Sequence, residues 1–204
     1  TTWKTGPCRA CLKGAKAMAE QQKLLFVAHC ILNTASKVVM YDTEEMAAEE
    51  ALRRRVVHAA TDAGVMLVQL PCPEFTLYGS RRWGHVSNQF DNPFFRAHCR
   101  GVLGTPLLEL EEYLQNPDRF EVLGFLGVDG SPSCGVKYTC TGPWGGNLGG
   151  RDDLPEVVAD VQLVPGRGVF FDELEGLLQE KGLALKLEGL FAPEPGRAMG
   201  MLGL

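Results

Sequence analysis

The sequence predicts an α/β protein with an open, mostly parallel sheet and helices on both of its faces. Three short apolar runs, at residues 24–28, 65–70 and 122–128, show little alternation between apolar and polar side chains. Runs of this length are typical of strands that are buried on both faces of a parallel sheet. Helix-sized segments separate them, and a regular alternation of strand and helix is the pattern of an open α/β sheet.

The segment between the first two predicted strands has the end signals of a helix. Residues 43–62 begin at Thr43, a suitable N-cap, and carry acidic residues in the first turn and basic residues later. Gly64 stands just beyond the end. This order is favoured by helix capping and by the helix dipole.

The later elements follow from the same signals. Residues 92–115 predict two helices, because the glycine and proline in 104–106 should interrupt a single one. Residues 169–180 predict a further helix that ends at Gly182. Residues 183–187 then predict a fourth strand.

One domain, residues 23–192, holds these elements. A chain of 204 residues has the size of one ordinary domain. Residues 1–22 predict an N-terminal extension, and residues 193–204 a tail rich in Gly and Pro. The stretch 141–153 contains five glycines around Trp144 and predicts a long functional loop.

Composition limits the classes of function. Hydrophobic residues make up 45% of the chain and charged residues 22%, which argues against a disordered or fibrous protein. The net charge of −5 argues against a long nucleic acid as partner and favours a small molecule. No apolar run reaches membrane-spanning length, and the first residues lack the pattern of a signal peptide. We therefore expect a cytoplasmic protein without a membrane partner.

The chain has seven cysteines, an odd number that predicts reduced thiols free for metal binding or catalysis. Cys30, Cys72 and Cys134 each follow one of the predicted strands at once or within a few residues. Ligands of open α/β sheets bind outside the carboxyl ends of the strands, so parallel pairing would bring these thiols to one edge. A buried cysteine can also serve as a small hydrophobic residue, but the repeated position after a strand favours a shared site. Three thiolates suit zinc with a bound water, or an iron–sulfur cluster with one open iron, and chemistry alone leaves both possible.

The segments around these cysteines resemble the three motifs of the thiouracil desulfurase (TudS) family. They read Ala28-His29-Cys30-Ile31-Leu32-Asn33, Leu70-Pro71-Cys72-Pro73-Glu74 and Gly130-Ser131-Pro132-Ser133-Cys134-Gly135. Residues 82–100 resemble a longer, TudS-related branch of desulfidases. The likeness covers about residues 24–190 in the same order. Family members commonly have glycine where Asn33 stands, and this difference concerns the substrate more than the cluster.

The resemblance implies a 4Fe–4S cluster that is held by the three cysteines, with a fourth iron free to take sulfur from a thiocarbonyl group. It implies an oxygen-sensitive, non-redox desulfurase that converts C=S to C=O by hydrolysis and releases sulfide. The substrate would be a thiouracil-like thiolated nucleobase or a related heterocycle, and a sulfur acceptor could be a further partner. Glu74 matches the acid of the Cys-Pro-Glu motif and is the candidate proton relay. Ser131 and Ser133 match the serines beside the third ligand and could bond the substrate or cluster sulfurs.

Four residues are candidates for substrate binding: Asn33, Arg82, Trp83 and Trp144. Trp83 and Trp144 could stack on a flat heterocycle, and Arg82 could meet a phosphate or carboxylate. Aromatic residues at this density are as often packing for the loops.

Two other functions stay open. An iron–sulfur electron carrier or redox sensor would need no open iron, and a fourth cysteine such as Cys140 would complete its ligands. A three-Cys zinc hydrolase would use the same thiolates plus water. Cys8 and Cys11 have metal or redox spacing, although a lone C-x-x-C is weak evidence. We expect Asp129 to cap a turn and His85 to lie at the surface.

Overall fold

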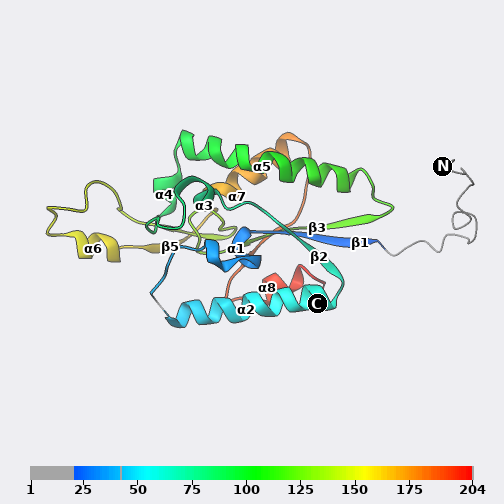
Figure 1. Ribbon diagram of the computed structural model, residues 1–204, viewed down its shortest axis with the longest axis horizontal. Coiled ribbons are helices and arrows are strands. Elements are labelled where there is room, and N and C mark those ends of the chain that lie inside the picture. The colour runs from blue at the N-terminus through cyan, green and yellow to red at the C-terminus, as the bar shows by residue number, and fades with distance from the viewer. Residues whose placement is uncertain (1–20, 42, 204) are drawn as a thin grey trace, which may run out of the picture.

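The computed structural model describes residues 21–41 and 43–203 (Figure 1). Its centre is a four-stranded parallel sheet with the strand order β2-β1-β3-β6. The strands are β1 (Gln22–Val27), β2 (Val65–Gln69), β3 (Phe120–Val128) and β6 (Leu187–Leu190). Helices lie on both faces of the sheet, with α5 and α7 on one side and α2 and α8 on the other in Figure 1. The predicted fold class is confirmed.

The direction in which strands are added reverses between β1 and β3. Strand β2 lies on one side of β1, whereas β3 and then β6 lie on the other side. In open α/β sheets, a crevice for ligands forms outside the carboxyl ends of the strands at such a reversal. The sheet therefore has its natural binding position next to the ends of β1 and β3.

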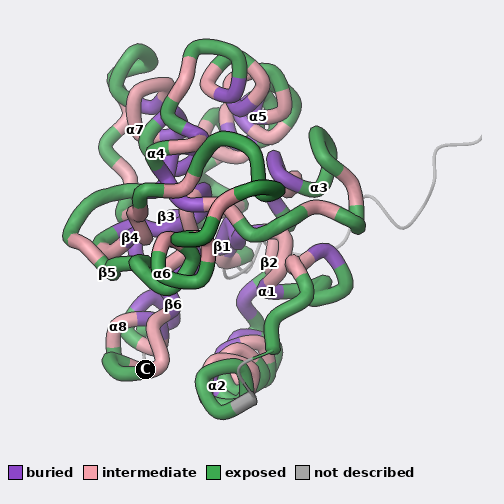
Figure 2. The backbone as a smooth tube through the Cα atoms, turned by 90° about the vertical axis from the view of Figure 1, so that its left-hand side faces the viewer, coloured by how far each residue is buried: buried purple, intermediate pink, exposed green. Residues whose placement is uncertain are grey.

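The centre of the sheet, formed by β1 and the second half of β3, is buried and apolar, whereas the edge strand β2 is partly exposed. In β1 the side chains of Leu25, Phe26 and Val27 have no exposed surface. Figure 2 shows buried segments concentrated along the sheet and on the inner turns of the helices. This rigid centre fixes the positions of the loops that leave the strand ends.

The helices cover the sheet and connect its strands. Their bounds are α1 (His29–Leu32), η2 (Thr34–Ser36), α2 (Thr43–Asp62), α3 (Pro73–Tyr78), α4 (Ser87–Phe90), α5 (Pro93–Leu114), α6 (Leu154–Ala159), α7 (Val169–Glu180) and α8 (Pro195–Gly200). Helix α2 has the bounds that the sequence predicts. Within the described residues, none of these helices is both long and apolar enough to cross a membrane.

The prediction of two helices over 92–115 was wrong, because α5 is continuous with Pro106 inside it. The Asn92 side chain caps its start by accepting the N–H groups of Phe94 and Phe95, at 3.1 and 3.0 Å. A buried row of leucines, including Leu103 and Leu107, runs past the proline. Packing of this row outweighs the one backbone hydrogen bond that proline removes.

The fourth strand also lies elsewhere than expected, at Leu187–Leu190 instead of 183–187. Its sequence contains a buried acid, Glu188, and Gly189, so it lacks the continuous apolar run by which a buried strand is predicted. Two further strands were not predicted, β4 (Tyr138–Thr141) and β5 (Gln162–Pro165), which pair antiparallel as a separate sheet. They are four residues each and partly exposed, so they carry little hydrophobic signal.

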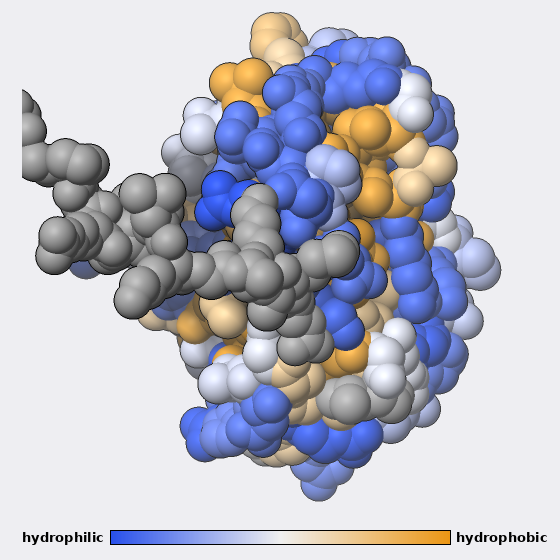
Figure 3. All heavy atoms as spheres, turned by 90° about the vertical axis from the view of Figure 1, so that its right-hand side faces the viewer, coloured by the Kyte–Doolittle hydropathy of each residue, from blue (hydrophilic) through white to orange (hydrophobic). Residues whose placement is uncertain are grey.

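The segment that the sequence sets apart as a tail includes α8. Ala198, Met201 and Leu202 of this segment are buried in the main core. The predicted N-terminal extension, with Cys8 and Cys11, lies outside the described residues except for its last two positions. Figure 3 shows the face at the amino ends of the strands, opposite the cysteines, where hydrophilic residues predominate among smaller hydrophobic areas.

Candidate functional site

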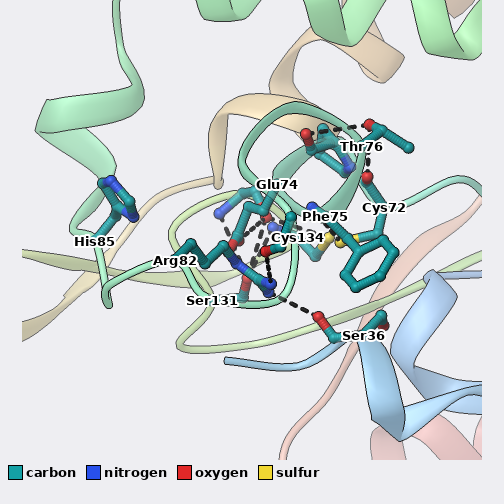
Figure 4. A network of polar contacts seen from close by, with 12 residues as sticks. Ser36, Cys72, Glu74, Phe75, Thr76, Arg82, His85, Ser131 and Cys134 are labelled. Atoms are coloured by element: carbon teal, nitrogen blue, oxygen red, sulfur yellow. Dashed lines mark hydrogen bonds and ion pairs between the residues drawn. The ribbon is translucent and has the colours of Figure 1, made fainter. Parts of the chain in front are cut away.

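Three cysteines lie beyond the carboxyl ends of three adjacent parallel strands. Cys30 is in α1 directly after β1, Cys72 is the N-cap residue of α3 after β2, and Cys134 is in the loop after β3. All three are free thiols. In Figure 4 the sulfur atoms of Cys72 and Cys134 point toward one another. The fold thus gathers residues that are 42 and 62 positions apart in the sequence.

The surroundings of these thiols favour the neutral form in a chain without metal. Burial raises the pKa of Cys30 to about 12, with smaller contributions from Cys72 and Glu74, while Lys37 opposes the shift. Burial also raises the pKa of Cys134 well above the ordinary thiol range, and the nearby Cys30 and Cys72 add to it. Three thiolates can therefore coexist here only with a compensating cation. Among the described residues, no group of three or more His, Cys, Asp or Glu is arranged to hold a single metal ion.

Two prolines shape the turn that presents Cys72. Pro71 lies two residues beyond the end of β2, and Pro73 stands in the first turn of α3, where a missing N–H costs nothing. The Phe75 N–H donates to Cys72 Sγ at 3.4 Å. The Thr76 hydroxyl donates to the carbonyl of Cys72 at 2.8 Å and fixes the same turn.

A compact turn presents Cys134, and Ser131 closes it. Ser131 Oγ accepts the N–H groups of Cys134 at 3.0 Å and Ser133 at 3.4 Å. Gly127 of β3 lies directly beneath, since a Cβ atom there would stand 2.3 Å from the Cys134 carbonyl oxygen. Ser131 thus shapes the backbone around the third cysteine.

The other serine of this motif points to a carboxylate. Ser133 is buried, and its hydroxyl donates to Glu74 Oε1 at 2.6 Å and lies 3.5 Å from Cys134 Sγ. Arg82 Nε donates to Glu74 Oε2 at 3.1 Å (Figure 4). The charge of Glu74 also contributes to the raised pKa of Cys30, Cys72 and Cys134. Both carboxylate oxygens of Glu74 are therefore held in place, and Ser133 links the carboxylate to Cys134.

The Arg82 side chain is only 3% exposed. Its Nη2 and Nη1 atoms donate to the carbonyls of Ser36 at 2.7 Å and Gly79 at 3.2 Å. All of its nitrogen atoms are thus used inside the protein. In this arrangement Arg82 positions the Glu74 carboxylate.

The remaining candidates for substrate binding have different surroundings. Asn33 Oδ1 accepts the Ala35 N–H at 3.1 Å and so caps η2. Trp83 is 76% exposed. The Trp144 ring lies against Gly84, and its Nε1 is buried without a hydrogen-bond partner in the described structure.

His85 is half-buried instead of lying at the surface as expected. Its ring stacks on Phe90 and Tyr78, with centroids 4.6 and 5.2 Å away. Burial lowers the pKa of His85, and the Glu74 charge opposes the shift. No period or motif in the sequence distinguishes this histidine, because its partners come from α3 and α4 through the turn between them.

A surface cavity of about 390 Å³ lies away from the cysteines. It is lined by α7 and residues 183–187, mostly with aliphatic side chains, and contains no thiol. The chemistry-bearing residues are instead at the carboxyl edge of the sheet.

Comparison with known proteins gives one distant relative. Over 115 residues the chain is 28% identical to the uncharacterized protein MJ0003 of Methanocaldococcus jannaschii. The aligned part covers 56% of this chain and 69% of that protein. No protein-family model and no solved structure matches the chain.

Proposed function

We propose that this protein is an iron–sulfur-dependent desulfurase that removes sulfur, as sulfide, from a thiocarbonyl compound. The observation that carries the proposal is the position of Cys30, Cys72 and Cys134 beyond three adjacent strands, with the Glu74 carboxylate bonded to Ser133 next to Cys134. The resemblance of the three cysteine motifs to the TudS family supports it. A thiouracil-like nucleobase or a related small heterocycle is the proposed substrate.

The donor set suits a 4Fe–4S cluster. Soft thiolates favour iron–sulfur clusters and zinc over hard cations, and the three cysteines would be the cluster ligands. Their burial disfavours three uncompensated thiolates, so binding of a cationic group relieves this cost. When bound, the cluster would supply an open iron as a Lewis acid for the thiocarbonyl sulfur.

Glu74 is the proposed general base and acid. Water adds to the thiocarbonyl carbon, and Glu74 accepts the proton that the water loses. The same carboxyl group then returns that proton to the sulfur as the C–S bond breaks, and the hydroxyl group of the adduct gives up its own proton to the departing sulfur as the C=O bond forms. The balance is one C=S group and one water giving one C=O group and hydrogen sulfide, so no oxidant or reductant is needed.

Arg82 and Ser133 hold Glu74 for this task. Each binds a different carboxylate oxygen, at 3.1 and 2.6 Å, which limits rotation of the group. Ser133 also lies 3.5 Å from Cys134 Sγ and joins the acid to the third ligand position. Preorganised groups of this kind need no rearrangement during the reaction.

The free thiols and the proposed oxygen-sensitive cluster fit a reducing compartment, so we propose a cytoplasmic location. The released sulfide would diffuse away or pass to a sulfur acceptor.

The test is sulfide release from 2-thiouracil by anaerobically reconstituted protein, with uracil measured as the second product. We expect Glu74→Gln to lower the rate per bound cluster about 10²- to 10⁴-fold, which is the usual contribution of a general acid–base group. The rate is expressed per bound cluster because loss of the Glu74–Arg82 pair also destabilises the chain. Glu180→Gln is the matched control, since Glu180 pairs with Arg100 on the surface. A filled cluster that releases no sulfide from any thio-heterocycle would contradict the proposal and favour an electron carrier or redox sensor.

A further inference from the structure

Asp129 follows β3 directly, and its carboxylate is fully buried. Asp129 Oδ1 accepts three successive backbone N–H groups, from Val136 at 2.8 Å, Lys137 at 2.9 Å and Tyr138 at 3.3 Å. These bonds close the base of the loop that carries Cys134. Asp129 therefore acts as the turn cap that the sequence suggests, and it closes the loop of the third cysteine.

The second oxygen of this carboxylate belongs to an ion pair with the C-terminal helix. Arg197 of α8 donates through Nη2 to Asp129 Oδ2 at 2.7 Å. The same guanidinium donates to Glu188 Oε1 of β6 from Nη2 at 2.6 Å and from Nε at 2.8 Å. The Arg197 side chain is 13% exposed, so solvent screens this pairing little.

Gly189 of strand β6 leaves room for the Asp129 carboxylate because it has no side chain. A Cβ atom at Gly189 would lie 2.3 Å from the atoms of the Asp129 carboxylate. The carboxylate is therefore confined between β6, Arg197 and the loop backbone. Removal of the guanidinium would leave Asp129 Oδ2 buried without its cation, and this cost would fall on the loop that Oδ1 holds.

We propose that Arg197 is a positioning residue for Cys134 and acts through Asp129. The inference rests on the proposed function, in which Cys134 is a cluster ligand. In the described part of the chain, the hydrogen bonds and ion pairs of Arg197 go to Asp129, Glu188 and Glu194. Its effect should therefore fall on the third cysteine and spare the other two.

Cys30 and Cys72 are held by separate contacts. The backbone of α1 is tied to α2 by Arg53, which donates to the Ile31 carbonyl at 2.8 Å. Cys72 is held by Thr76 within α3. The two cysteines thus provide internal references for a change confined to Cys134.

The experiment is timed labelling of the full chain, without reconstitution, by iodoacetamide under reducing conditions, with each cysteine quantified by mass spectrometry. We expect Arg197→Ala to raise the ratio of the Cys134 labelling rate to the Cys30 labelling rate about tenfold. A factor of this size is the expected effect of losing one charge-assisted hydrogen bond that holds the loop closed. Arg197→Lys, which keeps the positive charge, should restore most of the protection. Arg100→Ala is the control, because it breaks ion pairs between α5 and α7 away from this loop.

An unchanged ratio of Cys134 to Cys30 labelling in Arg197→Ala would overturn the proposal. Equal acceleration at every cysteine would also overturn it, because it would indicate general loosening of the chain. If Arg197→Ala does not fold, Asp129→Asn gives the same test with a side chain of nearly equal size. Labelling needs no cluster, so a chain that binds no iron would refute the proposed function and leave this result standing.

Discussion

Replacing Glu74 by glutamine should destabilise the chain strongly, because Glu74 and Arg82 form a buried ion pair. Their side chains are 12% and 3% exposed. Removing one partner of a buried pair costs about 3–5 kcal/mol, since the other charge stays behind without compensation. In Glu74→Gln the amide oxygen can still accept from Ser133, and Arg82 keeps the carbonyls of Ser36 and Gly79. We therefore expect the free energy of unfolding to fall by about 3 kcal/mol, the lower end of this range.

The assay is urea denaturation of the cluster-free chain at neutral pH. With a slope of about 2 kcal/mol per molar urea, the midpoint should fall by about 1.5 M. Arg82→Met and the double variant complete a thermodynamic cycle. Because the two residues interact directly, their effects should fall short of additivity by about 1 kcal/mol or more. A loss below about 0.5 kcal/mol in Glu74→Gln, or strictly additive effects, would refute the view that this pair organises the site.

Other predictions concern the serines, two glycines and a buried thiol. Ser133→Ala should lower sulfide release about 10- to 100-fold, the kinetic equivalent of one hydrogen bond to a charged group. Ser131→Ala should instead speed iron loss to a chelator, because its hydroxyl holds the N–H of the third cysteine; equal behaviour of the two variants would contradict their different roles. Gly104→Ala should stabilise the chain by about 0.5–1 kcal/mol in urea denaturation, because at this exposed position in α5 the new Cβ would meet no atom within 4 Å beyond the adjacent backbone of its own helix. Gly127→Ala should destabilise it by about 1–3 kcal/mol or more, because its Cβ would lie 2.3 Å from a carbonyl oxygen. Burial raises the pKa of Cys99 to about 12, whereas the unfolded thiol ionises near pH 9. The neutral Cys99 thiol should therefore stabilise the folded chain below pH 9, and this contribution should be lost as pH rises from 9 to about 12. The free energy of unfolding should thus fall less steeply over this pH range in Cys99→Ala than in the unchanged protein. Identical pH dependence of the two proteins would contradict this prediction.

The sequence predicts the part of the site that depends on strand ends. Cys30, Cys72 and Cys134 each stand at or near the end of an apolar run, and parallel strands bring their carboxyl ends to one edge. Glu74 could be singled out because it stands in the same tight turn as a cysteine. These signals are local in the sequence, and the parallel arrangement of the strands brings the residues close together.

The contacts that hold these residues could not be predicted. The Asp129–Arg197 pair spans 68 positions, and the hydrogen bond from Ser133 to Glu74 spans 59. Residue type alone cannot tell which serine caps the turn and which points to the acid, because turn geometry decides this. The helix break expected at Pro106 failed for a related reason, since packing of the helix against its neighbours outweighs a local preference.

The central claim is that three cysteines hold an iron–sulfur cluster with an open iron. Its most direct test is anaerobic reconstitution with iron and sulfide, followed by iron and acid-labile sulfide counts and by absorption and EPR spectra. The account predicts about four irons and four sulfides per chain, lost in Cys30→Ala, Cys72→Ala and Cys134→Ala and kept in Cys140→Ala. A colourless protein that binds one zinc and no iron would contradict it and would favour a three-Cys zinc hydrolase.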